Sequence, residues 1–363
     1  MSLNHPADLA AWNGAILAHQ SRLRNLRNRT RSRQVHEPAR LLLPDRSAPE
    51  SVDVLIVIET PTPSQLAALI APMRFLAPER VAVLTNADSG HRLLGDRSSS
   101  SVSITDHHDL GRAVPGLRSV LTYGHYMRLG AMADITARMV GATSFVAQHG
   151  IITPLAPPLP ADSHLLAWSD ADAAFWSSGR SDVEQHVVGS QLLHEASRDT
   201  STVGHLRTRT NGDNVDTSAG ITYLGQLHGH ELPRHAKASA ANHFCRTSGA
   251  IYRPHPSERD LVSRMQHALW RGRGVRFDST GLPLRQLHTS IVSVFSTGVL
   301  EAAAAGIPAW VDFPNPPAWL EELWQRYSMS KYGSIEPTMV EIPIDEPARV
   351  IAEIITTPTK ARR

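Results

Sequence analysis

Short apolar runs alternate along this chain with longer stretches whose apolar residues recur at helical spacing. In the first half, the apolar runs predict strands and the stretches between them predict helices. The strands are expected at 52–58, 80–85, 102–104, 119–124, 142–148, 164–168 and 185–189, and the helices at 63–75, 127–140, 170–176 and from 109 onward. Because strands and helices follow each other in turn, the pattern predicts a parallel, doubly wound sheet.

The second half repeats this alternation after a polar segment at 197–218, where we expect a domain boundary. Further strands are expected at 221–227, 249–253 and 274–277, with helices at 233–245, 257–271 and 284–289. The stretch 293–311 predicts a short buried strand, a Ser-Thr-Gly turn, a helix of small residues and a second apolar strand. The predicted organisation is an arginine-rich helical extension at 1–49, domains at 50–210 and 219–345, and a C-terminal helix at 346–363.

The composition is that of a folded protein, with 41% of the 363 residues hydrophobic and 19% charged. A net charge of +2 argues neither for nor against a polyanionic partner. The one cysteine, Cys245, excludes an internal disulfide and a cysteine-rich metal site. The sequence contains no secretory signal pattern and no apolar run of about 20 residues, so we expect a cytoplasmic location.

Six arginines lie between Arg22 and Arg33, in the predicted helical extension. A run of this kind is typical of a solvated helix face or a loose arm. The alternative is attraction to an acidic polymer or to anionic lipid headgroups, which would hold the protein peripherally at the inner face of a membrane. Nucleic acid is a less favoured partner, because no recognised binding motif accompanies the arginines.

The first candidate motif, Gln148-His149-Gly150, follows a predicted strand. Ligands of open α/β sheets bind beyond the carboxyl ends of the strands. A histidine there has a pKa suited to proton transfer near neutral pH. His149 is therefore a candidate catalytic base, with a structural hydrogen-bonding role as the alternative, and Gly150 is a further candidate of the same motif.

The second motif is Arg253-Pro254-His255-Pro256-Ser257-Glu258-Arg259, at a predicted strand end and helix start. Two prolines fix the backbone around His255, and Arg253 and Arg259 add cationic donors suited to phosphate. The competing interpretation is that the prolines only end a strand and that His255 is a structural loop residue.

The third motif combines Ser296, Thr297 and Gly298 with Glu301 at a predicted helix start. Hydroxyls, backbone N–H groups and the helix dipole together suit a phosphate. Glu301 either caps the helix or accepts hydrogen bonds from a ribose, as acidic residues do in nucleotide-binding α/β folds. Gly225 and Gln226, at another strand end, are expected to contribute to the same nucleotide site.

The three motifs together resemble those of glycosyltransferases with the GT-B architecture, over about residues 52–333. Bacterial sialyltransferases and polysialyltransferases, and the CDP-glycerol glycerophosphotransferases of teichoic acid synthesis, are the most similar groups. The resemblance implies an α/β fold of two Rossmann-like parallel-sheet domains that face a cleft. It also implies that Arg253, His255, Ser296 and Thr297 bind a cytidine nucleotide, and that His149 and His255 are the catalytic residues, with His149 as the base.

The resemblance implies a bacterial transferase that moves a sugar or polyol phosphate from a CMP- or CDP-activated donor to a capsule, teichoic-acid or lipid-linked acceptor. Because glycosyltransferases of the GT-B architecture generally dispense with a metal, the resemblance implies no metal and no cofactor beyond the donor. Two alternatives stay open: an inactive GT-B-like protein that binds RNA or an acidic polymer through the arginine-rich extension, and a UDP-sugar transferase or epimerase.

Overall fold

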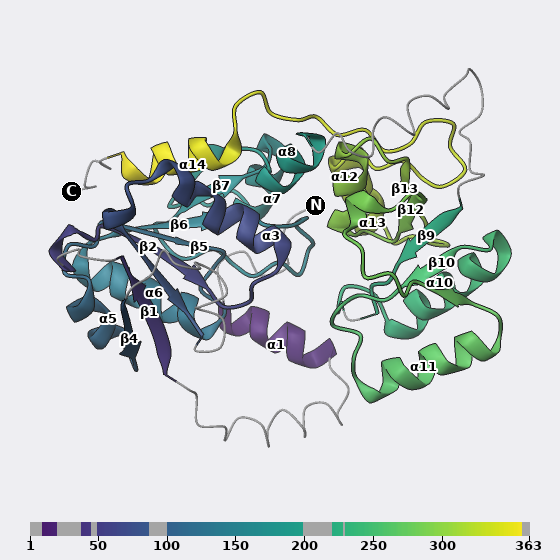
Figure 1. Ribbon diagram of the computed structural model, residues 1–363, viewed down its shortest axis with the longest axis horizontal. Helices are drawn as coiled ribbons and strands as arrows, with labels where there is room; N and C mark the ends of the chain where they lie inside the picture. The colour runs from purple at the N-terminus through teal and green to yellow at the C-terminus, as the bar shows by residue number, and fades with distance from the viewer. Residues whose placement is uncertain are drawn as a thin grey trace. The chain divides into compact units, whose positions relative to one another are not determined.

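The computed structural model describes residues 9–19, 38–44, 49–86, 100–198, 220–227 and 229–357. The chain divides into two compact units, here called the N-terminal unit (residues 2–192 and 343–363) and the C-terminal unit (residues 193–342). Figure 1 shows a sheet with helices packed on it in each unit. The predicted α/β class, with a parallel sheet in each half, is therefore confirmed. None of the described helices has the length and hydrophobicity needed to cross a membrane.

The N-terminal unit is built on an eight-stranded sheet with the order β4-β1-β3-β2-β5-β6-β7-β8. Its strands are β1 (Ala39–Leu43), β2 (Val54–Ile58), β3 (Val81–Thr85), β4 (Ser100–Ile104), β5 (Ser119–Thr122), β6 (Thr143–Ala147), β7 (His164–Ala167) and β8 (Glu184–Val187). From β3 to β8 all neighbouring strands are parallel, as predicted.

The strand β1 was not predicted, because its residues were assigned to the helical extension. It pairs antiparallel with both β3 and β4. Leu41 and Leu42 are buried, which explains why this short apolar run joins the sheet. Of the remaining extension, α1 (Leu9–His19) is a helix, whereas Arg22 to Arg33 lie outside the described residues.

Helices cover both faces of this sheet. They are the continuous helical segment α3 (Pro63–Gln65), η2 (Leu66–Ile70) and η3 (Ala71–Phe75), then α5 (His107–Ala113), α6 (Arg128–Val140), α7 (Asp170–Ser177) and α14 (Pro347–Thr356). Alternate residues of β2 enter opposite cores: Ile56 packs in a cluster with Ile351 of α14, and Leu55 in one with Leu129 of α6. The C-terminal helix therefore completes the N-terminal unit, where it lies beside η3 (Figure 1).

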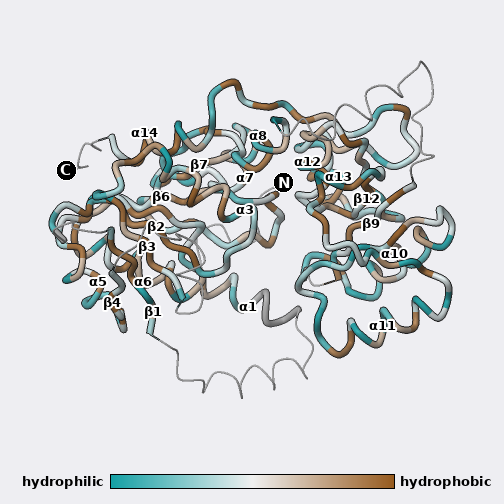
Figure 2. The backbone as a smooth tube through the Cα atoms, viewed as in Figure 1, coloured by the Kyte–Doolittle hydropathy of each residue, from teal (hydrophilic) through white to brown (hydrophobic). Residues whose placement is uncertain are grey.

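The C-terminal unit has a five-stranded, fully parallel sheet with the order β11-β10-β9-β12-β13. Its strands are β9 (Ile221–Leu224), β10 (Ile251–Arg253), β11 (Arg276–Phe277), β12 (Ser290–Ser293) and β13 (Ala309–Val311). Its helices are α10 (Arg234–Ser248), α11 (Leu261–Gly272), α12 (Thr297–Ala304), α13 (Ala318–Arg326) and the short 3₁₀ turn η8 (Leu284–Gln286). In Figure 2 the hydrophobic colour follows β9 and β12, whereas α11 alternates between the two colours.

Several boundaries differ from the prediction. The helix expected from Ser257 begins at Leu261, because the carboxylate of Asp260 caps it by accepting the Ser263 N–H. The strand expected to start at Ser293 ends there. The helices α8 (Gln191–Arg198) and α13 were not predicted. Most of the polar segment at 197–218, where a boundary was expected, lies outside the described residues.

Candidate functional site

The carboxyl ends of β9, β10 and β12 meet at one edge of the C-terminal sheet. Since β9 lies between β10 and β12 and all three strands are parallel, the residues that follow them share that edge. The structure therefore brings together there the predicted nucleotide-site residues of this unit, namely Gly225, Gln226, Arg253, His255, Ser296, Thr297, Gly298 and Glu301. Of the predicted residues, His149 and Gly150 belong to the N-terminal unit.

Gln226 fastens the end of β9 to the turn that follows β12. Its side-chain oxygen accepts hydrogen bonds from Ser293 Oγ at 3.1 Å and from the Phe295 N–H at 2.9 Å. Ser293 Oγ also lies 3.0 Å from the Leu224 carbonyl oxygen. These contacts fix the backbone just before Ser296, so Gln226 positions the start of α12.

The start of α12 is a capped helix end. Ser296 Oγ accepts the Gly298 N–H at 3.1 Å, and its hydroxyl proton can be donated to another group because a hydroxyl both accepts and donates. A Cβ on Gly298 would lie 2.7 Å from Leu224 Cδ1. Glycine at this position therefore lets α12 approach the end of β9, with Thr297 as the first residue of the helix.

Glu301 lies one turn into α12 and does not cap the helix. Its carboxylate has no hydrogen-bond partner among the described residues, whereas Ser296 fills the capping role. Burial raises the pKa of Glu301, and the charges of Arg285 and Arg253 oppose that rise. A half-buried carboxylate of this kind can accept hydrogen bonds from ligand hydroxyls.

Arg253 and Arg259 differ in what they contact. Arg253 forms an ion pair with Asp278 at 3.1 Å and donates a hydrogen bond to the Leu282 carbonyl at 2.6 Å. It therefore ties the loop after β11 to β10, and its charge also reaches Glu301. Arg259 is exposed on the turn between β10 and α11.

His255 is half-buried, and the turn that carries it fixes its tautomer. Its Nδ1 accepts the Ser257 N–H at 3.1 Å, so the neutral imidazole carries its proton on Nε2. Burial lowers the pKa of His255, and the charge of Glu258 opposes that shift. At neutral pH the ring is therefore neutral, and Nε2 is the nitrogen that carries the proton.

A buried carboxylate of this motif, to which sequence reasoning gave no role, supports this turn. Glu258 accepts hydrogen bonds from the Leu227 N–H, the Tyr252 hydroxyl and His267 Nε2, at 3.0, 2.9 and 3.1 Å. Burial raises the pKa of Glu258, but the three hydrogen bonds outweigh it and the pKa lies below its usual value. The ionised carboxylate thus joins the ends of β9 and β10 to α11.

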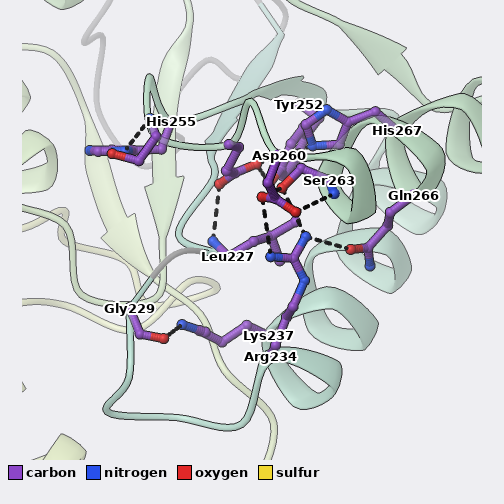
Figure 3. A network of polar contacts seen from close by, with 12 residues as sticks. Leu227, Gly229, Arg234, Lys237, Tyr252, His255, Asp260, Ser263, Gln266 and His267 are labelled. Carbon is purple, nitrogen blue, oxygen red and sulfur yellow. Dashed lines mark hydrogen bonds and ion pairs between the residues drawn. The ribbon is translucent and has the colours of Figure 1, made fainter. Parts of the chain in front are cut away.

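The start of α10 is joined to the same region (Figure 3). Arg234 donates hydrogen bonds to Ser263 Oγ at 2.9 Å and to the Gln266 side-chain oxygen at 3.3 Å. The buried ammonium group of Lys237 donates to the Gly229 carbonyl. These contacts anchor the loop after β9 beside the turn that carries His255.

In the N-terminal unit, His149 follows β6 and packs against Tyr123, with ring centroids 5.1 Å apart. Its buried Nδ1 has no hydrogen-bond partner among the described residues. Burial lowers the pKa of His149 to about 4, so the imidazole is neutral at pH 7. His149 lines a small pocket with Ser64 and Trp168 that has room for about one water.

Gln148 holds the turn at His149 rigidly. Its side-chain nitrogen donates to the Gly150 carbonyl at 3.0 Å and to Asp172 at 2.9 Å, and its side-chain oxygen accepts the Trp168 N–H at 2.8 Å. The Trp168 indole N–H donates to the Gln148 carbonyl at 3.0 Å. Sequence reasoning included Gln148 in the motif but gave it no role, and it missed Asp172.

Glu59 is a buried carboxylate that the sequence did not reveal. It follows β2 and accepts the Leu129 N–H at 2.6 Å, at the start of α6. Burial raises the pKa of Glu59, while backbone hydrogen bonds and the charge of Arg128 oppose the rise. Burial, with the nearby charge of Glu59, also raises the pKa of Tyr123 to about 12. The signal in the sequence was an acidic residue directly after an apolar strand.

No protein-family model and no curated protein matches the sequence. Among solved structures, the chain is similar to Anabaena HepE in complex with UDP and glucose, with 13% identity over 84% of this chain and 95% of that one and a TM-score of 0.43. It is similar to the glycotransferase of kitacinnamycin, with 13% identity, 85% and 92% coverage and a TM-score of 0.41. It is also similar to a Thermobaculum terrenum O-GlcNAc transferase mutant, with 12% identity, 87% and 62% coverage and a TM-score of 0.43.

Proposed function

We propose that this chain is a GT-B glycosyltransferase or glycerophosphotransferase that uses a nucleotide-activated donor. The observation that carries the proposal is the carboxyl edge of the C-terminal sheet. A capped helix start, a half-buried carboxylate and a histidine of fixed tautomer meet there. A helix start can bind a phosphate, a carboxylate can accept hydrogen bonds from a ribose, and a histidine can donate a hydrogen bond to a departing anion.

The donor nucleotide would be bound by groups of three kinds. Its phosphate would accept hydrogen bonds from the hydroxyls of Ser296 and Thr297 at the positive end of α12. Its ribose hydroxyls would donate to Glu301. The phosphate would accept a further hydrogen bond from His255 Nε2. This nitrogen carries the proton because Nδ1 accepts the Ser257 N–H.

In the reaction, an acceptor hydroxyl attacks the transferred carbon or phosphorus as the bond to the nucleotide phosphate breaks. The nucleotide leaves as an anion, which the hydrogen bond from His255 and the dipole of α12 stabilise. The hydroxyl proton passes to His149, which is in its neutral, proton-accepting form at pH 7. A pKa of about 4 makes His149 a weak base, so the proposal requires bound substrate to raise this pKa.

The motif resemblance favours CMP or CDP as the leaving nucleotide and a cell-surface polysaccharide, teichoic-acid-like or lipid-linked polymer as the acceptor. The helix dipole and His255 would supply the charge stabilisation that a metal supplies in other transferases, so donor binding should not require magnesium.

The test is calorimetric titration of the full chain with CMP, CDP, UDP and GDP, first without metal and then with magnesium. We expect a cytidine nucleotide to bind without metal and His255→Ala to lose that binding. His288→Ala, which removes an exposed histidine of the same unit, should bind normally. A preference for UDP would replace the cytidine donor by a UDP-sugar, and the absence of binding by all four nucleotides would overturn the proposal.

The base is tested separately. His149→Ala should bind the nucleotide as the wild type does and lose turnover once an acceptor is identified. Normal turnover in this variant would remove His149 from the mechanism while leaving the donor site intact.

A further inference from the structure

Three metal-ligating side chains meet on the outer strands of the N-terminal sheet. His164 is the first residue of β7, and Glu184 and His186 lie two residues apart on β8, the edge strand. In the parallel pairing His164 lies opposite Glu184, and Leu166 lies opposite His186. Residues two apart on a strand point to the same face, so the register brings all three side chains to one face.

The separations between their ligand atoms are close to those of a zinc site. His164 Nδ1 lies 3.0 Å from His186 Nε2, and His186 Nε2 lies 3.5 Å from Glu184 Oε1. One ligand atom from each residue lies within 4.8 Å of the others. Zinc bound to nitrogen and oxygen at about 2.0–2.2 Å in a tetrahedron places neighbouring ligand atoms roughly 3.3–3.5 Å apart. Small side-chain rotations would bring this set to that geometry.

We infer that His164, Glu184 and His186 form a zinc site. Two imidazoles and one carboxylate are a donor set that zinc accepts, with the fourth position left to water. The burial pattern agrees, because the side chains of His164 and His186 are 11% and 24% exposed and that of Glu184 is 50% exposed. The histidines thus anchor the ion on the protein side, and the carboxylate lies toward solvent.

The site is separate from the proposed transferase chemistry. None of its three residues belongs to the proposed transferase site. In the register of the sheet, His186 lies level with Ala147, two residues before His149, with β7 between them. The edge strand β8 is mostly exposed, and among the described strands it pairs with β7 alone. A zinc ion bound to one residue of β7 and two of β8 would fasten this edge strand to the sheet.

The sequence offered little sign of this site. Glu184-x-His186 is a common spacing, and His164 lies 20 residues away in the chain. The set becomes visible only when the register of β7 and β8 is known. Without metal, the competing arrangement is a hydrogen bond between the two imidazoles. The 3.0 Å between His164 Nδ1 and His186 Nε2 also fits such a bond.

The experiment uses the full chain, stripped with a chelator, loaded with zinc and passed through metal-free buffer. We expect one retained zinc per chain, and a higher Tm with zinc than without it, because an ion that binds the folded state stabilises that state. Glu184→Gln combined with His186→Gln should lose both the retained zinc and the rise in Tm. His108→Ala, which removes an exposed histidine on α5, should keep both.

Cobalt substitution gives a second readout that does not depend on stability. Cobalt in a tetrahedral site absorbs strongly in the visible range, and we expect this absorption in the wild type and in His108→Ala but not in the double variant. Failure of the wild type to retain zinc, or equal retention by the double variant, would overturn the site. Neither result bears on nucleotide binding, so this proposal and the transferase proposal fail independently.

Discussion

His267 Nε2 lies 3.1 Å from Glu258 Oε2, and both side chains are almost completely removed from solvent. Because the hydrogen bonds to Glu258 lower its pKa despite burial, the carboxylate is ionised and can only accept. His267 therefore donates through Nε2. The pair joins α11 to the turn that follows β10, on which His255 lies.

Glu258→Ala should strongly destabilise the C-terminal unit. The change leaves the Tyr252 hydroxyl, the Leu227 N–H and His267 without their shared acceptor, and each buried polar group left unsatisfied costs about 1–3 kcal/mol. Urea unfolding measures this loss. The matched control is Glu321→Ala, which removes an exposed ion pair with Lys331 and should cost less than about 1 kcal/mol. Equal losses in the two variants would show that the buried network contributes little.

Gly225→Ala should disturb the same network from the side of β9. A Cβ at this position would lie 2.4 Å from the Tyr252 hydroxyl oxygen and 2.8 Å from Glu258 Oε1. We expect a loss of about 1–3 kcal/mol from overpacking, together with weaker nucleotide binding. Gly272→Ala is the control, since no described atom outside its chain neighbours and its own helix backbone lies within 4 Å of the added Cβ. Wild-type stability in Gly225→Ala would contradict the close packing described here.

The sequence predicted those features that depend on neighbouring residues. Apolar runs located nearly all the strands, and the turns after them supplied the candidate residues now found at one sheet edge in the C-terminal unit. The place of Gly225, His255 and Ser296 follows from a simple rule, that the carboxyl ends of parallel strands share an edge. Periodicity and turn chemistry were sufficient for these.

Features set by contacts between distant parts of the chain were not predictable. β1 was missed because a short apolar run beside many arginines gives no sign of the strands that will pair with it. The buried partners of Glu258 come from three separate elements, and α14 packs on the N-terminal sheet although it ends the chain. Sequence reasoning also left two roles open for Glu301, and the structure removed one of them, because Ser296 caps the helix.

Glu301 should make the affinity for the nucleotide depend on the ribose hydroxyls. If its carboxylate accepts hydrogen bonds from ribose hydroxyls, wild-type protein should bind CMP more tightly than 2′,3′-dideoxy-CMP. A lost hydrogen bond to a charged group corresponds to about 1.5–3 kcal/mol, or roughly 10- to 150-fold in affinity. In Glu301→Ala the two nucleotides should bind equally. Titration calorimetry measures all four affinities, and a variant that still discriminates would exclude the ribose role.

His149 should make stability depend on pH in a defined direction. Burial lowers its pKa from 6.5 to about 4, so between these values the unfolded chain binds a proton that the folded chain does not. Stability is then complete above about pH 6.5 and falls as the pH drops toward 4, by an amount on the order of 3 kcal/mol. Burial also lowers the pKa of His125, His186 and His255, so the wild type loses stability through several histidines at once.

The contribution of His149 is therefore measured by comparing the pH dependence of Tm in a His149 variant with that in the wild type. His149→Phe keeps an aromatic ring against Tyr123 but cannot titrate, so its Tm should fall less than that of the wild type between pH 7.5 and pH 4.5. The measurements are made with a chelator present, so that metal bound at His186 does not change the Tm. His108→Ala, at an exposed position, should follow the wild-type curve. Parallel curves for His149→Phe and the wild type would mean that His149 is protonated as easily in the folded protein as in the unfolded chain. That result would contradict the lowered pKa of His149.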